Sequence, residues 1–350
     1  MQSDSSTSLQ QPPTFSIEDR LEDSDLEQLE HASQADRAAA SFHLLPTAAL
    51  LAAFSVVGTL VRIGLLDLHN YPDAPVISVI YPQIVGCVII GWTNVYKNSV
   101  SKRYHPIYVA IATGLCGSIT TFSTWSLDTF LALSSTGNAR QSWNGDNVLA
   151  GIAITVVVLS VSLSSLSFGE AIALLPTTLS TRPPPAPRPW LQLRFDQTDV
   201  AAMVMGGSVW ACAVVLTFAV PGWRNVMAAA AIGPFGTLLR WRLSLLNLRH
   251  AKFPLGTFFA NMLGTLCIGI LYLLSHRASA STNVCILLNA LSTGFCGCLT
   301  TVSTFVVELS SLPKAAAWTY GAVSIAGGLA LLTVVLGGTA AHITEGACLT

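Results

Sequence analysis

Two segments of this chain are near copies of one another, and neither is suited to an uninterrupted helix. The first reads T-G-L-C-G-S-I-T-T-F-S-T-W-S-L-D at residues 113–128, and the second reads T-G-F-C-G-C-L-T-T-V-S-T-F-V-V-E at residues 293–308. Their Gly, Ser and Thr cores are poor in helix formers, yet both lie in apolar runs. In lipid, a broken helix is tolerated only where its freed backbone groups face protein, an ion or water. We therefore predict two broken helices that meet deep in a membrane.

Composition supports a membrane protein. Of the 350 residues, 52% are hydrophobic and 10% are charged, whereas about a quarter of a soluble domain is charged. At about 20 apolar residues for each crossing, nine spans are expected at residues 46–66, 75–96, 107–134, 148–175, 199–221, 225–247, 254–275, 284–312 and 315–342. Pro82 is expected to kink the second span. Residues 1–45 are predicted to be a disordered cytoplasmic tail, and residues 176–198 a Pro-rich linker.

The two broken segments belong to a longer internal repeat. They are 180 residues apart, while Arg62 and Arg240, like Gln83 and Asn261, are 178 residues apart. This gives two four-span repeats, at residues 46–175 and 222–343, with an unmatched span at 199–221. Since one extra crossing turns the second copy upside down, we predict an all-α polytopic membrane protein with two inverted repeats, each with a broken third helix. Thirteen of the 17 basic residues then share the side of the N-terminus, which places that end in the cytoplasm and residues 344–350 outside.

The cysteines do not form an obvious disulfide set. Seven of the eight, including Cys285, lie in or beside apolar runs, so they are expected to be small packing residues. Cys296-x-Cys298 could ligate a soft metal, but no His lies nearby and packing is favoured. The chain also has no HExxH, GxSxG or P-loop motif, which argues against an enzyme.

Several polar residues inside the spans are candidates for an ion path. Arg62 and Arg240 each end the first span of their repeat, after Gly and three further residues, where they could attract anions in an aqueous vestibule or simply snorkel to the interface. Asn261, with Gln83 as its counterpart, could donate to an anion, although a carboxamide in a span more often bonds another helix. Four threonines at the breaks could cage a monovalent cation: Thr120, Thr121, Thr300 and Thr301.

Aromatic and acidic residues flank the breaks. Phe122 and Phe305 could turn their positive ring edges toward an anion, or only pack. Asp128 and Glu308, which close the two copies, could be groups on a polar track or helix-end carboxylates near the interfaces.

The G-F-C-G-C-L-T-T-V-S-T-F string, the N-x-x-G second span and the G-x-x-x-R first span resemble the fluoride exporters of the Fluc/FEX (CrcB) family in its fused double form. The resemblance covers about residues 47–343. It implies a passive fluoride-selective channel of the plasma membrane that works as a single chain, a pseudo-dimer, with no nucleic-acid partner and no organic cofactor. It also implies a central structural Na⁺ held by backbone carbonyls of Gly117, Thr120, Gly297 and Thr300. The implied fluoride path is lined by Asn261, Phe122, Phe305, Tyr320, Ser324 and Thr301.

The first repeat departs from the family pattern. Since each path in that family draws one ring from each half, an intact set can be assembled from Phe122, Phe305 and Asn261. The complementary set is degraded, because it consists of Trp125, Val302 and Gln83. Tyr320 and Ser324 have no clear match in the first repeat. We therefore expect one working pore. The alternatives are a secondary transporter or exchanger of another small ion or metabolite, and a membrane scaffold without flux.

Overall fold

The computed structural model describes residues 44–68, 77–134, 144–179, 195–250, 252–277, 281–337 and 348. The predicted tail lies outside these residues, apart from its last two positions, as does most of the Pro-rich linker. Residues 45–350 form one unit. Wherever the structure describes regular secondary structure, that structure is helical.

The first repeat contains four helical segments, of which the third is broken. The unbroken ones are α2 (Leu44–Asp67), α3 (Ile80–Val95) and α7 (Asn144–Leu179). The broken one consists of α4 (Lys97–Val109), the π-helical η1 (Ala110–Cys116), α5 (Gly117–Ile119) and α6 (Phe122–Leu133). Pro82 stands in the first turn of α3, where a proline costs no intrahelical hydrogen bond. The expected kink is therefore wrong.

The second repeat follows the same order after the unmatched helix α8 (Phe195–Ala219) and the short η3 (Pro221–Trp223). Its first two helices are α9 (Arg224–Ser244), which continues into η4 (Leu245–Arg249), and α10 (Leu255–Arg277). Its broken helix consists of α11 (Thr282–Asn289), η5 (Ala290–Cys296), α12 (Gly297–Leu299) and α13 (Ser303–Ser311). The last helix is α14 (Lys314–Leu336). The predicted nine segments are therefore present. Most ends are shifted by a few residues, but the third segment begins at Lys97, well before the predicted start at residue 107.

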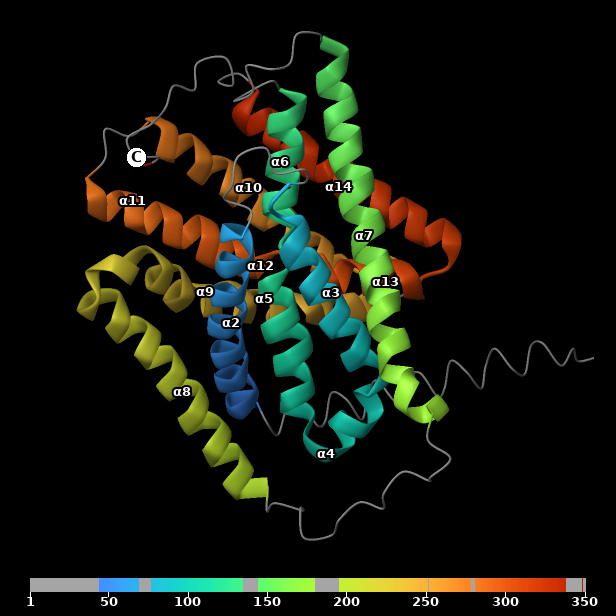
Figure 1. The fold of residues 1–350 in the computed structure, drawn as a ribbon, viewed down its shortest axis with the longest axis vertical. Coiled ribbons are helices and arrows are strands. Elements are labelled where there is room, and N and C mark those ends of the chain that lie inside the picture. Colours follow the sequence, from blue (N-terminus) through green and yellow to red (C-terminus); the bar gives the residue numbers. More distant parts are fainter. Residues whose placement is uncertain are drawn as a thin grey trace, which may run out of the picture. The chain divides into compact units, whose positions relative to one another are not determined.

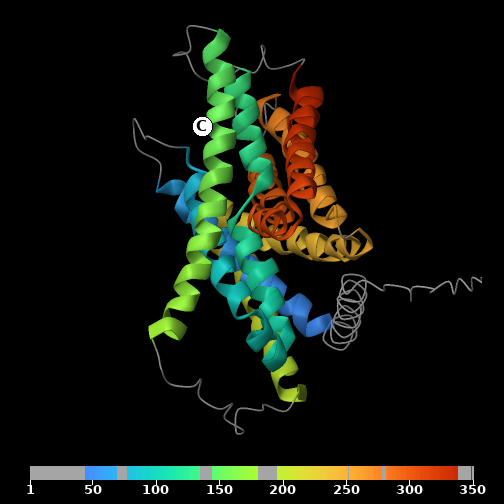
Figure 2. The same ribbon diagram turned by 90° about the vertical axis from the view of Figure 1, so that its right-hand side faces the viewer.

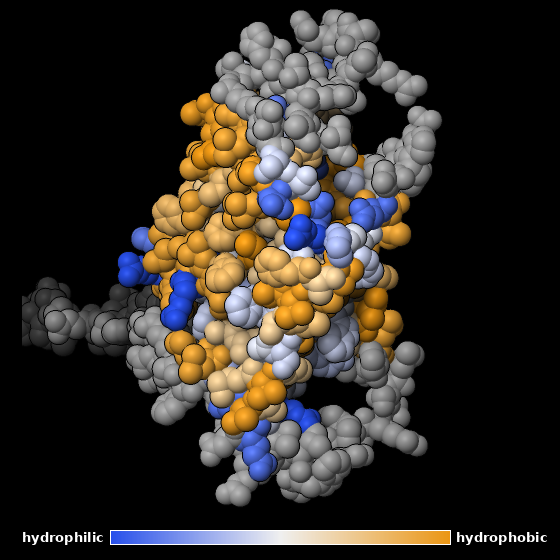
Figure 3. Space-filling view, turned by 90° about the vertical axis from the view of Figure 1, so that its left-hand side faces the viewer, coloured by the Kyte–Doolittle hydropathy of each residue, from blue (hydrophilic) through white to orange (hydrophobic). Residues whose placement is uncertain are grey.

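Most of these segments are suited to a bilayer. Among the described residues, seven helices are long and apolar enough to cross a membrane. The other two expected spans are α3, with 16 residues, and α9, whose 21 residues include three arginines. In Figure 3, hydrophobic side chains (orange) make up most of the coloured surface of one face, as expected for helices that contact lipid. The chain is a multi-pass membrane protein.

Both predicted helix breaks are present, and the two broken helices cross at their breaks, near α5 and α12 in Figure 1. The backbone is extended at Thr120 (φ −85°, ψ 150°) and Thr121 (φ −145°, ψ 125°) in the first repeat. Thr300 is extended in the same way (φ −92°, ψ 155°). A π-helical turn precedes each break by three residues, so the two copies share their irregular geometry as well as their sequence.

The two repeats exchange equivalent contacts. Helix α14 of the second repeat packs against α6 of the first, while α7 of the first packs against α13 of the second; Figure 2 shows α7 (green), α6 and α14 (red) beside one another. Reciprocal contacts of this kind are what a twofold axis produces. The fold is therefore a duplicated repeat related by a pseudo-twofold axis.

The unmatched helix α8 is anchored to the first repeat as well as to α9. Gly206 lies so close to α2 that a Cβ atom would stand 2.3 Å from the Ala49 carbonyl oxygen. Trp210 Nε1 donates to the Ala231 carbonyl on α9 (2.9 Å), and Tyr104 donates to Asp199 Oδ1 (2.7 Å). The helix that we expected to act only as a spacer is therefore also hydrogen-bonded to α4 and α9.

One cysteine differs from expectation, because Cys285 forms a disulfide with Cys348. Cys285 lies in the first turn of α11 and is partly exposed, so its thiol can reach a residue of the C-terminal tail. The prediction that it only packs in an apolar run is wrong. The other six cysteines are free thiols, and four of them are buried.

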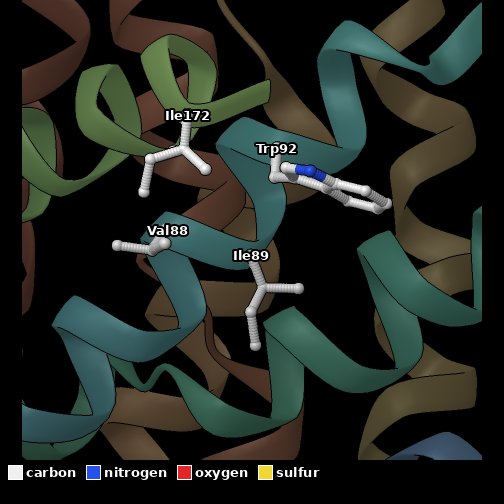
Figure 4. Close-up of a pocket in the computed structure, with 5 residues that line it drawn as sticks. Val88, Ile89, Trp92 and Ile172 are labelled. Atoms are coloured by element: carbon white, nitrogen blue, oxygen red, sulfur yellow. The ribbon is translucent and has the colours of Figure 1, made fainter. Parts of the chain in front are cut away.

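An apolar groove runs over the outer surface where α3 crosses α7. It is lined by Val88, Ile89, Trp92, Gly169 and Ile172, and Figure 4 shows Ile172 from α7 facing the α3 residues. No polar surface lines it, so we assign it to the lipid-facing surface and not to an ion path.

Candidate ion path and central site

Each break is completed by a threonine of the opposite repeat. The Thr120 hydroxyl accepts a hydrogen bond from the Ser303 amide (3.1 Å), in the first turn of α13. The Thr300 hydroxyl accepts from the Ser123 amide (3.2 Å), in the first turn of α6. Both threonines are fully buried. Because free amides at a helix start need an acceptor, each repeat helps to cap the broken helix of the other.

Asn261 and Gln83 hold the backbone of the breaks, but not equally well. Asn261 Oδ1 accepts from the Thr301 amide (2.9 Å), and its Nδ2 donates to the Thr301 carbonyl (3.2 Å). Gln83 Nε2 donates to the Thr121 carbonyl (2.8 Å), whereas Gln83 Oε1 is buried and has no hydrogen-bond partner among the described residues. Only Asn261 therefore binds both the backbone amide and the backbone carbonyl of its threonine.

Arg62 and Arg240 lie inside the protein, with 1% and 4% of their surfaces exposed. Each guanidinium binds one carbonyl of each repeat: Arg62 binds Ser118 (2.6 Å) and Thr293, and Arg240 binds Cys298 (2.9 Å) and Thr113 (2.8 Å). The predicted position at an aqueous vestibule is therefore replaced by a reciprocal pair of arginines that ties the repeats together.

Glycines explain why the arginines reach so far inward. A Cβ atom on Gly236 would lie 2.3 Å from the Phe295 carbonyl oxygen, so α9 touches the backbone just before the break. Arg240 follows four residues later, on the same helix face. Gly117 leaves room for the guanidinium, since a Cβ atom there would lie 2.1 Å from Arg240 Nη1. Gly58 and Gly297 provide the same clearances for Arg62.

Five aromatic rings form a continuous row beside the breaks. Successive centroids are 5.1, 5.2, 5.6 and 5.3 Å apart along Phe253, Tyr320, Phe305, Phe122 and Trp125. We call these five residues the aromatic row. Its last four rings are at most 2% exposed. Phe122 and Phe305 are thus in contact, but Trp125, expected in the degraded set, also packs against Phe122, and Val302 belongs to the same buried cluster.

A partly buried carboxylate, that of Glu308, adjoins one end of the aromatic row. Tyr320 donates to Glu308 Oε2 (2.7 Å), and Glu308 Oε1 accepts from Thr257 (2.6 Å) and Asn247 (3.1 Å). Of the two interpretations left open for Glu308, these contacts favour a polar track. Ser324, one turn after Tyr320, is fully buried, and its hydroxyl has no hydrogen-bond partner among the described residues. Sequence reasoning missed Asn247 and Thr257, which lie outside the repeat's motifs.

The packing of α7 and α14, the last helices of the two repeats, shows which residues of the first repeat correspond to Tyr320 and Ser324. Gly91 meets Leu166, and its repeat counterpart Gly269 meets Leu332. Leu166 is then equivalent to Leu332, and the same spacing in sequence pairs Tyr320 with Ile154 and Ser324 with Val158. The residue equivalent to Thr257 is Val79. The first repeat therefore has apolar residues where the second has hydroxyl groups.

The α3–α7 pair is also packed more closely than its counterpart. A Cβ atom on Gly91 would stand 2.2 Å from the Leu166 backbone oxygen, and one on Gly169 would stand 2.1 Å from the Val88 backbone oxygen. In the second repeat, Gly269 meets the Leu332 side chain instead. Backbone against backbone leaves less space between α3 and α7 than side chains leave between α10 and α14.

The family model described as "CrcB-like protein, Camphor Resistance (CrcB)" matches residues 49–168 and 227–339, once in each repeat. Fluoride export protein 1 of Neurospora crassa is 35% identical over 84% of this chain, which spans 66% of that protein. Its Candida albicans namesake is 31% identical over 81% of this chain and 77% of its own length. The fluoride-specific ion channel FluC of Pseudomonas paraeruginosa is 37% identical over 33% of this chain but 91% of its own length. No solved structure matches. The chain belongs to the CrcB family.

Proposed function

We propose that this protein is a passive fluoride channel, which lets fluoride leave the cytoplasm across the plasma membrane. The single observation that carries the proposal is the polar and aromatic track on one side of the crossed breaks. It runs from Glu308, which Tyr320, Thr257 and Asn247 bind, along the aromatic row, beside Ser324 and Asn261. The names of the relatives support fluoride as the ion.

The track suits a small, strongly hydrated anion. A selective path must replace the water around fluoride with closely spaced donors in a pore too narrow for larger halides. The Ser324 hydroxyl is buried and has no hydrogen-bond partner among the described residues. The Asn261 amide nitrogen carries two protons, and it donates one hydrogen bond, to the Thr301 carbonyl. Aromatic edges carry the positive end of the ring quadrupole and can face an anion. A membrane potential of 100 mV, negative inside, supplies about 2.3 kcal/mol per fluoride.

We propose a single working pore between α6, α10, α13 and α14. On the opposite side, the positions equivalent to Tyr320 and Ser324 are apolar. There Gln83 takes the place of Asn261, and the backbones of α3 and α7 are in contact. The second side then serves as a scaffold, within one chain whose halves span residues 46–175 and 222–343.

The proposal is tested by fluoride efflux from liposomes that contain purified protein. We expect fluoride efflux far above chloride efflux, and a loss of at least about tenfold in Phe305→Ile, which removes one ring of the aromatic row. Phe235→Ile on the exposed face of α9 is the control and should conduct normally. Fluoride efflux that requires a proton or sodium gradient would instead indicate an exchanger.

We further propose a structural Na⁺ at the crossing of the breaks. The Thr120 and Thr300 hydroxyls are already hydrogen-bonded, and the Ser118 and Cys298 carbonyls bind arginines. The carbonyls of Gly117, Thr120, Gly297 and Thr300 lie at helix ends, where intrahelical amides run out, and hard oxygen donors suit such a cation. The ion would hold the two breaks together.

Sodium dependence of stability tests this site. Exchange of Na⁺ for N-methylglucamine at equal ionic strength should lower the unfolding temperature of the purified protein, because binding to the native state stabilises it by mass action. Unchanged unfolding temperatures over a 100-fold range of sodium concentration would remove Na⁺ from the proposal and leave the fluoride path untouched.

The Cys285–Cys348 disulfide indicates how the chain is oriented in the membrane. Disulfides persist on the oxidising side of a membrane, so we propose that the start of α11 and the C-terminal tail face outward. With nine crossings, the N-terminus is then cytoplasmic, in agreement with the distribution of basic residues.

This orientation predicts which reductants act on intact cells. A membrane-impermeant phosphine should open the disulfide and allow an impermeant maleimide to label two more thiols in the wild type, but not in a Cys285→Ser, Cys348→Ser double variant. If only a permeant reductant works, the C-terminus faces the cytoplasm and the proposed orientation is wrong.

A further inference from the structure

We propose that the indole N–H of Trp125 is a fluoride-binding donor at the exit side of the working pore, which is a further selectivity determinant of the function proposed above. The Trp125 ring is 2% exposed. Its Nε1 is buried and has no hydrogen-bond partner among the described residues. Buried donors are rarely left unpaired in folded proteins, so a transient partner is the expected explanation.

A small cavity lies beside this ring. Phe122, Trp125, Ser126, Thr129, Thr155, Ile325 and Leu329 line it. Its volume is about 10 Å³, close to the least that holds one water molecule. The space therefore suits a particle of the size of fluoride and is too small for a larger halide.

The cavity continues the proposed track. Helix α14 presents Tyr320, Ser324 and Gly328 at four-residue intervals, hence on one face. A Cβ atom on Gly328 would lie 3.2 Å from Phe122 and 3.1 Å from the Ser126 hydroxyl, so the missing side chain leaves room beside both. Phe122 is shared by the aromatic row and the cavity lining. An ion that passes Ser324 and Phe122 thus meets Trp125 next.

The polar groups of the cavity give Trp125 a distinct role. Thr129 donates its proton to the Trp125 carbonyl (2.9 Å), and Thr155 donates to the Gly151 carbonyl (2.9 Å). Their protons are thus already used within their own helices, so these two hydroxyls supply no donor to the cavity. The indole N–H can only donate, so it favours an anion there, whereas phenylalanine at this position would supply a ring without a polar donor.

Trp125→Phe separates the donor from the ring. The variant keeps an aromatic side chain against Phe122 and removes one N–H. We expect fluoride efflux from liposomes to fall about tenfold, with chloride efflux unchanged or higher. Trp92→Phe, at an exposed position on α3, is the matched control and should conduct as the wild type does.

A direct readout is the ¹⁵N–¹H resonance of the Trp125 indole in nanodiscs, assigned by its absence from Trp125→Phe. Fluoride should shift this resonance with saturation, while chloride at equal concentration should not. Wild-type flux with full activity in Trp125→Phe, or an indole resonance that does not respond to fluoride, would overturn the inference. Absence of fluoride flux in the wild type would instead reject the proposed channel, and the resonance would still report whether Trp125 binds fluoride.

Discussion

Asn261→Ala should lower fluoride efflux by at least about tenfold, whereas Gln83→Ala at the equivalent repeat position should leave it within about twofold of the wild type. Asn261 binds the amide and carbonyl of Thr301, and each buried polar group left without its partner costs about 1–3 kcal/mol. Gln83 makes one bond to the other break and lies on the side proposed to be a scaffold. The initial rate of fluoride release from liposomes measures both variants.

The pair of variants is informative because each removes a carboxamide from the same place in its repeat. Size-exclusion chromatography and the unfolding temperature show whether each variant is folded. Equal losses in the two variants would mean that both sides conduct, and an active Asn261→Ala would take Asn261 off the path.

Arg240→Ala is expected to cause the largest loss of stability. It leaves the Cys298 and Thr113 carbonyls without their guanidinium partner, and hydrogen bonds to charged groups contribute about 1.5–3 kcal/mol each. Arg240→Lys should recover little, because a single ammonium cannot reproduce the fork that reaches one carbonyl in each repeat. The unfolding temperature in detergent should fall by roughly 6–20 °C in Arg240→Ala.

Arg242→Ala provides the control on the same helix. Arg242 is exposed and lies 5.2 Å from the Trp241 ring centroid, where an arginine contributes little. Its unfolding temperature should stay close to that of the wild type. If Arg240→Lys were as stable as the wild type, the positive charge alone would account for the role of Arg240, and the bridging hydrogen bonds would not matter.

The helix breaks could be predicted from sequence because the information is local. Gly, Ser and Thr between apolar runs disfavour a continuous helix, and the same string occurs twice at one spacing. The structure then has extended backbone at Thr120 and Thr300, the positions expected. The duplicated fold followed from the same spacing.

The location of the arginines could not be read in the same way. An arginine near the end of an apolar run is normally placed at the interface, and only the close approach of Gly236 to Phe295 carries Arg240 inward. The signal available was the glycine four residues earlier, which we interpreted only as part of a repeat motif. How deeply a side chain lies in a membrane protein depends on helix packing, and helix packing involves residues that are distant in sequence.

The disulfide was missed for a related reason, and the position of Trp125 for a different one. Cys285 and Cys348 are 63 residues apart, and no sequence pattern states that a helix start and a tail meet. Trp125 was assigned by its repeat position, whereas its contact with Phe122 arises from three-residue spacing within one helix.

The reciprocal arginine contacts also have a consequence for biosynthesis. Arg62 binds the carbonyl of Thr293, which lies 231 residues later in the chain. At about 5–20 residues per second, a ribosome needs roughly 10–50 s to supply that partner. Throughout this interval the newly inserted first half holds a charged guanidinium that lacks one of its final hydrogen-bond acceptors, so we expect it to stay near the insertion machinery or a membrane chaperone until the second half arrives.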